Sequence, residues 1–164
     1  MGRVLDCKST SRFFPDPLVF PADLAAHGFD DQTVRNILFT SIGGTTVRIR
    51  LSNTFGTQAV TIGRATIGTE LSGAQLVSNT VKAVTFSGHT EVTIPLGAEV
   101  VSDPIPLAVQ PFENLAVSLY LPHETGPATH HADAQQINFV AAGNHATDWG
   151  LWCNGTEKWF RKKR

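Results

Sequence analysis

The sequence is poor in charge, and neither sign is in excess. Charged residues make up 16% of the 164 positions, and the formal net charge at pH 7 is −1. A chain without an overall positive field lacks the electrostatic footprint of a nucleic-acid-binding protein, so we expect no nucleic-acid partner. The exception is a basic cluster within residues 158–164, which we interpret as a solvated chain end.

Long apolar runs and a visible signal sequence are also missing. No run approaches the ~20 apolar residues that a membrane-spanning helix needs, so we expect no membrane association. The first residues, MGRVLDCKSTSRFF, contain no apolar core of a signal peptide. Localisation therefore stays open, because the protein is either cytoplasmic or secreted with its signal already removed.

Cysteine is scarce. The two cysteines, Cys7 and Cys153, lie near opposite ends of the chain. They form a disulfide if the termini meet, or they stay unpaired thiols in a reducing compartment, and the sequence leaves both readings open. No spacing among these cysteines and the six histidines resembles a structural zinc site. We therefore expect no metal and no cofactor.

Period-two alternation is the strongest positive signal in the chain. Between Thr40 and Gly56, apolar residues alternate with arginines in the order Val47, Arg48, Ile49, Arg50, Leu51. Such alternation is typical of a strand with one buried and one solvated face. The preceding pair, Gly43-Gly44, accepts positive φ, so the segment is predicted to be a β-hairpin. The two arginines are expected to pair with acidic residues or to contact another domain.

Short strand candidates of this kind recur along the chain and are separated by Gly, Pro, Asn or Ser. They cover residues 33–41, 45–52, 58–67, 81–87, 90–95, 105–109, 114–121 and 135–141. Helical periodicity is nearly absent, which predicts an all-β fold, an antiparallel β-sandwich of jelly-roll type. The expected core residues are Val47, Ile49, Leu51, Ile62, Ile67, Val92, Ile94, Val117 and Leu119.

One domain is expected from the length of the chain. We predict the β-sandwich at residues 31–147. An irregular arm with three prolines precedes it at residues 1–30. A tail at residues 148–164 follows it, and this tail is rich in tryptophan and basic at its end.

A resemblance to a known family rests on several short stretches taken together. QTVR, SIGG, VRIRLSN and FG follow one another between Gln32 and Gly56. In this order and spacing they resemble the N-terminal β-domain of SGNH hydrolases, also called GDSL-type esterases or lipases. The similarity runs from about Phe29 to about Thr147. It implies a β-sandwich that precedes a catalytic α/β domain.

The catalytic motifs of that family are absent from this sequence. No Gly-Asp-Ser triplet is present, nor the later Gly-x-Asn-Asp and Asp-x-x-His motifs. Serine hydrolysis needs an activated serine, a base and oxyanion donors, so no catalytic residue is carried over. The chain is expected to be a non-catalytic accessory domain without esterase activity of its own, while the parent protein is an ester hydrolase.

Two groups of side chains are weaker site candidates. His131 and Asp133 share a face on a strand and would make a base and its orienting carboxylate, although a surface histidine beside a turn is the plainer interpretation. The tail carries three tryptophans: Trp149, Trp152 and Trp159. These form a platform for sugar rings, or are buried, or belong to an interface with a missing domain.

The expected partners follow from these interpretations. The first is the missing C-terminal hydrolase domain, on which the β-domain would pack. The second is another copy of the chain, associating through the aromatic segment 149–160. Two alternatives to the accessory domain stay open: a carbohydrate-binding module, and a small hydrolase with an unrecognised Ser/His/Asp site.

Overall fold

The computed structural model describes residues 27–128 and 138–150. There the chain consists of antiparallel strands, with a 3-10 turn at Ser78–Thr80. The strands are β1 (Gln32–Phe39), β2 (Gly44–Val47), β3 (Arg50–Ser52), β4 (Val60–Ile62), β5 (Arg64–Ser72), β6 (Gln75–Leu76), β7 (Lys82–Val84), β8 (Val92–Ile94), β9 (Glu99–Val101), β10 (Ile105–Val109), β11 (Asn114–Leu121) and β12 (Asn138–Ala142). The predicted all-β, antiparallel class is confirmed.

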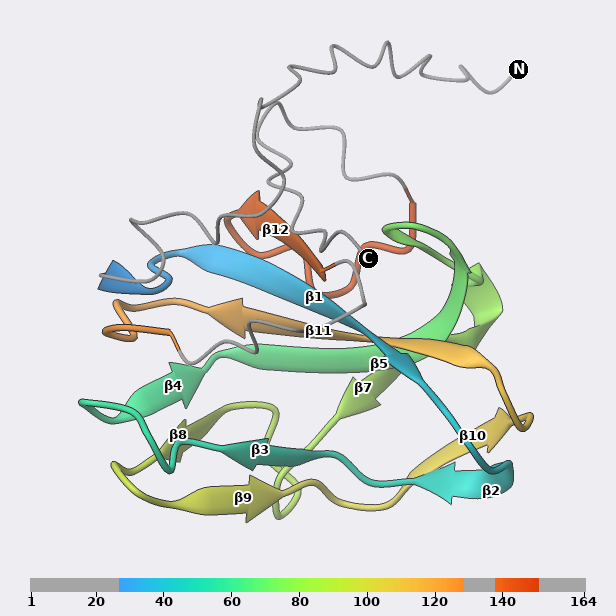
Figure 1. Cartoon of the computed structure of the whole chain (residues 1–164), viewed down its shortest axis with the longest axis horizontal. Coiled ribbons are helices and arrows are strands. Elements are labelled where there is room, and N and C mark those ends of the chain that lie inside the picture. The colour runs from blue at the N-terminus through green and yellow to red at the C-terminus, as the bar shows by residue number, and fades with distance from the viewer. Residues whose placement is uncertain (1–26, 129–137, 151–164) are drawn as a thin grey trace, which may run out of the picture.

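The main sheet has the order β12-β1-β11-β5-β6, and β7 also pairs with β5. Its long strands are in continuous register, with Val34 opposite Leu119 of β11 on one side and Val140 of β12 on the other. Strands far apart in the sequence therefore lie next to each other (Figure 1). This sheet forms the upper layer of the molecule in that view.

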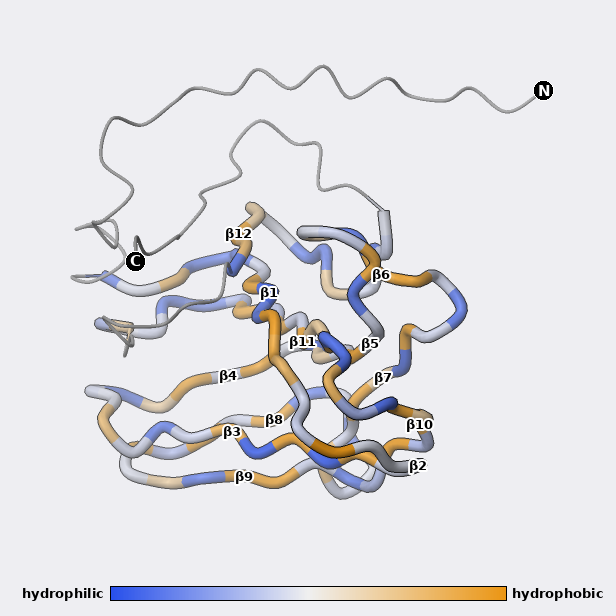
Figure 2. Tube along the Cα trace, turned by 45° about the vertical axis from the view of Figure 1, so that its right-hand side comes forward, coloured by the Kyte–Doolittle hydropathy of each residue, from blue (hydrophilic) through white to orange (hydrophobic). Residues whose placement is uncertain are grey.

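Three two-stranded ladders face the main sheet across the core. They are β10-β2, β3-β9 and β4-β8, which occupy the lower part of Figure 1. Hydrophobic residues are interrupted by hydrophilic ones along these short strands (Figure 2), as expected for strands with one buried face. The layers are continuous at one side, since Asp103 N donates to Thr85 O between β7 and β10. The sheets therefore curl around the core.

The core confirms the predicted alternation. Of the nine residues expected in it, five are buried: Ile49, Ile62, Ile67, Ile94 and Val117. The other four are partly buried and pack against the same cluster: Val47, Leu51, Val92 and Leu119. Period two in the sequence thus identified the inward-facing side chains correctly.

The predicted hairpin around Gly43-Gly44 is wrong. β1 pairs with β11 and β12, whereas β2 pairs with β10 in the other layer. Both edges of β1 are occupied by β11 and β12, which are longer than β2. β2 therefore has no free edge of β1 to pair with. Neither glycine is among the residues with positive φ. Gly43 is instead needed for close packing, since a Cβ there would lie 2.8 Å from Val109 O.

Two predicted strands are each divided in the structure. The strand expected at 45–52 breaks at Arg48 and Ile49, where the Ser102 hydroxyl accepts a hydrogen bond from Ile49 N at 2.9 Å. The strand expected at 58–67 breaks at Gly63, whose N–H donates to Tyr120 O. In both places the chain passes from one strand pairing to another, which local alternation does not reveal.

The described residues include only parts of the two predicted flanking segments. They are residues 27–30 of the arm and residues 148–150 of the tail. The rest of both segments, with Cys7 and Cys153, lies outside the described residues.

Candidate functional site

The outer face of the main sheet carries a buried arginine. Along β1, Val34 points into the core, so Arg35 points to the opposite face, where it is 0% exposed. Its Nε donates to Ser118 Oγ of β11 at 2.7 Å, and Nη1 donates to Ala74 O. Its Nη2 donates to Asp148 O at 2.5 Å. The guanidinium thus joins two strands, the β5–β6 turn and a segment beyond β12.

Burial changes the electrostatics of this group. Desolvation lowers the pKa of Arg35 to about 10, although the negative charge of Asp148 opposes the shift. The guanidinium is therefore still protonated at neutral pH. A buried charge is tolerated only when its hydrogen bonds are satisfied, so the backbone carbonyls that accept from Arg35 are held firmly in place.

Those carbonyls belong partly to an anchored segment, which we define as residues 143–150. Thr33 Oγ1 donates to Gly143 O at 2.6 Å, and Thr66 Oγ1 donates to Ala146 O. The two threonines are 0% and 2% exposed. The peptide groups of the anchored segment are therefore bound by buried side chains of β1 and β5.

The far end of the anchored segment is fixed as well. Leu76 N of β6 donates to Trp149 O at 2.9 Å. Ile37, Ala116 and Phe139 belong to a second apolar cluster on this side of the sheet. The main sheet is thus buried on both faces, and the chain is held until it reaches Gly150.

A histidine and an aspartate pair within the anchored segment. His145 Nδ1 lies 2.7 Å from Asp148 Oδ2, and the side chains are 24% and 51% exposed. This is the geometry of a base and its orienting carboxylate. No hydrogen bond between the described residues joins the imidazole ring to a serine hydroxyl. The pair was missed in the sequence, although His-x-x-Asp at 145–148 was a usable signal.

The predicted site residues are placed only in part. Trp149 is 56% exposed, and its backbone carbonyl anchors the segment. Trp152 and Trp159 lie outside the described residues, as do His131 and Asp133. The sugar platform and the His131–Asp133 pair therefore stay predictions.

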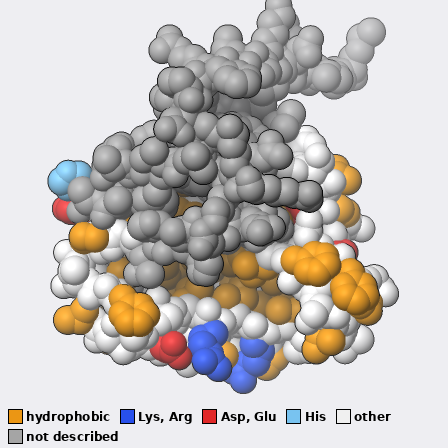
Figure 3. Space-filling view, viewed as in Figure 1, with side chains coloured by type: hydrophobic (Ala, Val, Ile, Leu, Met, Phe, Trp, Pro, Cys, Tyr) orange, Lys and Arg blue, Asp and Glu red, His pale blue; other side chains and the backbone are white. Residues whose placement is uncertain are grey.

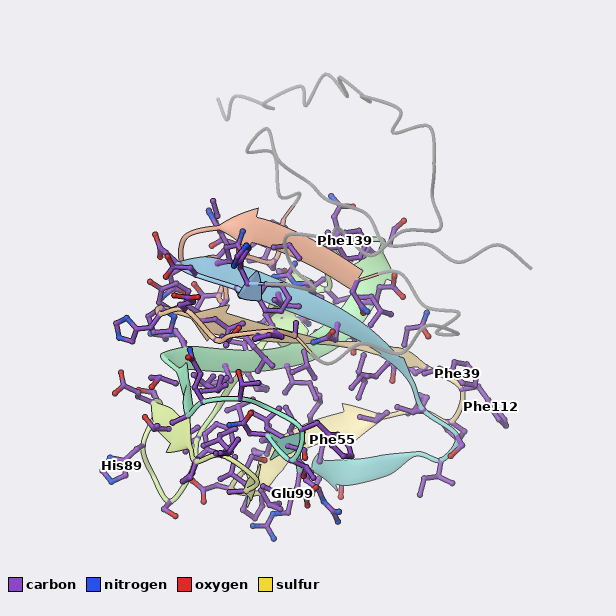
Figure 4. All side chains as sticks on the ribbon, turned by 60° about the vertical axis from the view of Figure 1, so that its left-hand side comes forward. Phe39, Phe55, His89, Glu99, Phe112 and Phe139 are labelled. Atoms are coloured by element: carbon purple, nitrogen blue, oxygen red, sulfur yellow. The ribbon has the colours of Figure 1, made fainter. Side chains whose placement is uncertain are left out.

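A second candidate region is an aromatic corner, which we define as Phe39, Ile42 and Phe112. These residues are 62%, 79% and 71% exposed. The rings of Phe39 and Phe112 stack with centroids 6.1 Å apart and an angle of 28° between planes. Figure 4 shows the two rings side by side, projecting away from the strands. Apolar side chains gather at this end of the molecule in the space-filling view of Figure 3.

The backbone at the aromatic corner is strained. Phe112 has φ +65°, a left-handed conformation that costs a non-glycine residue roughly 1–2 kcal/mol. It is held by hydrogen bonds from Phe112 N to Thr40 O and from Thr40 N to Glu113 O, both 2.9 Å. Glu113 Oε2 accepts from Gln110 N at 2.8 Å. The turn therefore fixes a large apolar side chain in an exposed position.

A further exposed aromatic, Phe55, belongs to the loop between β3 and β4, which lies on the other side of the lower layer from β2 in Figure 1. Phe55 is 80% exposed. The neighbouring Asn53 side chain donates to Gln58 O, Ile94 O and Pro95 O, at 2.8, 3.0 and 3.2 Å. Hydrogen bonds thus hold this loop in place, as they do the turn of the aromatic corner. It has no stacked aromatic partner among the described residues.

The expected pairing of the strand arginines is confirmed for one of them. Arg50 lies 3.6 Å from Glu99 of β9. Arg48 instead donates from Nε to Ser102 O at 2.8 Å. Both side chains therefore act within the domain, and Figure 3 shows basic and acidic side chains together at the lower rim.

No helix in residues 27–128 and 138–150 is long and apolar enough to cross a membrane. In the same residues, no three His, Cys, Asp or Glu side chains gather to hold a metal ion. A scan against models of known protein families finds no match, and a search of the curated proteins finds no significant relative.

Proposed function

We propose that this chain is a non-catalytic β-domain that packs on and positions a catalytic domain of SGNH type. The resemblance of residues 29–147 motivates the proposal. The observation that carries it is the anchored segment, since a domain that orients a neighbour needs a rigid connection to it. The buried side chains of Arg35, Thr33 and Thr66 bind this segment through hydrogen bonds, and the bond from Thr66 is itself buried.

The physical argument concerns rotational freedom. A flexible linker lets two domains sample many orientations. Here the peptide carbonyls of Gly143, Ala146 and Asp148 are each fixed by a buried donor. The chain that leads to a following domain therefore leaves the β-domain from a defined point beside β6, where Leu76 N donates to Trp149 O.

The coding DNA after the Arg164 codon tests the parentage directly. A downstream frame that encodes a strand ending in Gly-Asp-Ser supports the proposal. A frame that contains neither this motif nor the Gly-x-Asn-Asp and Asp-x-x-His motifs contradicts it.

An ester hydrolysis assay on the chain alone tests the absence of catalysis. We expect no hydrolysis of a chromogenic acetate ester above buffer. The His145–Asp148 pair is the feature that would make this expectation wrong. Activity that disappears in His145→Gln but persists in His89→Gln, an exposed histidine of the β7–β8 turn, would assign an active site to the pair and reject the accessory role.

The positioning role is tested in the protein that joins both domains. Thr66→Val removes the donor to Ala146 O with little change in shape, so the esterase kcat/KM should fall severalfold. The control is Thr61→Val, since the Thr61 hydroxyl bonds to the exposed Thr93 hydroxyl and not to the anchored segment as the structure describes it. Equal kcat/KM for both variants would show that the anchored segment does not orient the catalytic domain.

A further inference from the structure

The aromatic corner needs a reason other than the stability of the fold. Phe112 has a left-handed conformation that glycine or asparagine would adopt at lower cost. The residue is largely exposed, so burial does not offset the strain. Exposed apolar residues that hydrogen bonds hold in a strained turn are typical of interaction sites. The position of the corner in the fold indicates which partner covers it.

The corner lies on the same face of the main sheet as the anchored segment. Side chains alternate along β1, so Arg35, Ile37 and Phe39 share its outer face. Arg35 donates to Asp148 O, and Phe39 lies about 13 Å further along the same strand, at ~3.3 Å per residue. Ile37 is buried between them in the second apolar cluster. The anchored segment and the corner therefore belong to one side of the molecule.

The anchored segment also ends at the end of the sheet that carries the corner. Leu76, whose N–H donates to Trp149 O, pairs with Glu70 of β5. Glu70 Oε2 accepts a hydrogen bond from Asn114 Nδ2 at 2.6 Å, and Asn114 pairs with Phe39. One row of residues across the sheet thus connects the last anchored peptide with the corner. Figure 2 shows β6 and β2 on the same side of the molecule.

We propose that the aromatic corner is the surface on which the catalytic domain of the same polypeptide docks. The proposal rests on the proposed function and names the contact through which the two domains pack. Residues 151–164 continue the sequence beyond Gly150, and fully extended they span at most about 50 Å. The corner lies only roughly 20 Å from Trp149, at ~4.8 Å per strand. A domain that begins after these residues is therefore held within reach of the corner.

The apolar area of the corner favours a tethered partner over a free one. Phe39 and Phe112 each expose roughly 100–170 Å², given that an aromatic residue buries about 150–250 Å² in full. With Ile42 the corner offers about 400 Å², half of the ~800 Å² that each partner contributes to a standard interface between separate proteins. Interfaces between domains of one chain can be as small as ~600 Å². Covalent connection raises the effective concentration of the partner, so a contact of this size suffices.

Hydroxyl-radical footprinting tests the proposal, because the rate at which a phenylalanine side chain is oxidised follows its exposure. The two samples are the 164-residue chain and the protein that joins it to the catalytic domain. In the chain alone, Phe39 and Phe112 should be oxidised about as fast as Phe55, which is also largely exposed. In the two-domain protein, oxidation of Phe39 and Phe112 should fall severalfold, whereas that of Phe55 should stay unchanged.

Ile42→Lys tests the same contact by mutation. Ile42 is highly exposed, so the variant should stay folded. A charge at this position disfavours burial under a second domain. Oxidation of Phe39 and Phe112 in the two-domain protein should therefore return to the rate of the chain alone. The matched control is Leu96→Lys, at an exposed apolar position between β8 and β9, which should leave both rings protected.

The outcomes separate this proposal from the proposed function. Equal oxidation of the corner rings in both samples overturns the docking contact alone, since the comparison of Thr66→Val with Thr61→Val tests the positioning role independently. Slow oxidation already in the chain alone also overturns it, because the corner would then be covered without a second domain. Protection that rises with protein concentration overturns it too, since a second copy would be the occupant.

The variants give two further ways to reject the contact. Protection that persists in Ile42→Lys, or that is lost equally in Leu96→Lys, shows that the catalytic domain does not dock on the corner. A reading frame downstream of Arg164 without the catalytic motifs overturns the proposed function and the docking surface together.

Discussion

Replacing Arg35 by leucine should be among the most damaging single changes in the described part of the protein. The side chain is 0% exposed and donates to Ser118 Oγ, Ala74 O and Asp148 O. Leucine fills part of the volume of the arginine stem but donates no hydrogen bond. The variant therefore leaves the buried carbonyl oxygen of Ala74 and the part-buried carbonyl oxygen of Asp148 without these donors.

The magnitude follows from the acceptors that lose a partner. Each buried acceptor left unsatisfied costs ~1–3 kcal/mol, and the Ser118 hydroxyl must also find a new partner. Removing the guanidinium returns part of its desolvation cost, which is the cause of the lowered pKa of Arg35. We expect the free energy of unfolding to fall by about 3 kcal/mol, a large share of the ~5–15 kcal/mol typical of a domain.

Urea unfolding followed by far-ultraviolet circular dichroism measures this change. With an m-value of ~1–3 kcal/mol/M for a small protein, the midpoint should fall by roughly 1–3 M. The control is Arg50→Leu, because that arginine is exposed and lies 3.6 Å from Glu99, and such surface pairs contribute about 0–1 kcal/mol. A loss below ~1 kcal/mol for Arg35→Leu at unchanged m would refute the view that Arg35 holds the anchored segment.

Three smaller perturbations test other parts of the structure. Thr66→Val removes one buried donor to the anchored segment and should lower the free energy of unfolding by about 1 kcal/mol in the same urea assay. Gly56→Ala should cost about 2 kcal/mol or more, because its Cβ would lie 1.8 Å from Asn53 Oδ1 and displace an amide that makes three hydrogen bonds; an unchanged melting temperature would contradict this. The backbone N–H of Gly88 and, to a smaller extent, the side-chain hydroxyl of Thr85 donate hydrogen bonds to the Asp103 carboxylate and lower the pKa of Asp103. The ionised Asp103 carboxylate therefore stabilises the fold fully above its ordinary pKa of about 4, and this stabilisation is lost as the pH falls through the lowered pKa. Asp103→Asn should accordingly flatten the pH dependence of the melting temperature in that acidic range.

Sequence periodicity predicted the inward-facing residues well, because alternation is a local property of a strand. Ile49, Ile62 and Ile94 are buried as their positions in the pattern required. Strand partners were harder to predict. The glycine pair at 43–44 has the chemistry of a hairpin turn, yet β1 and β2 belong to different layers. Pairing depends on which long strands compete for an edge, and that competition involves residues more than 70 positions away.

The candidate sites were mostly invisible in the sequence, for the same reason. Phe112 is an ordinary residue in a turn until its positive φ and its stacking on Phe39 are known. His145 and Asp148 are close in sequence, but their pairing at 2.7 Å depends on the path of the anchored segment. The weaker candidates His131 and Asp133 stay predictions, as do Trp152 and Trp159.

The sequence by itself determined the all-β class and the two faces of the core strands, because side-chain direction along a strand repeats every two residues. Only the tertiary structure decided that the Arg35 side chain is buried. A charged residue within an alternating segment is expected to face solvent. Arg35 is buried instead, and its guanidinium donates a hydrogen bond to the carbonyl of Asp148, 113 positions later in the chain. Burial of a charge requires donors and acceptors from several elements to converge, and only the folded arrangement of β1, β11, the β5–β6 turn and the anchored segment provides them.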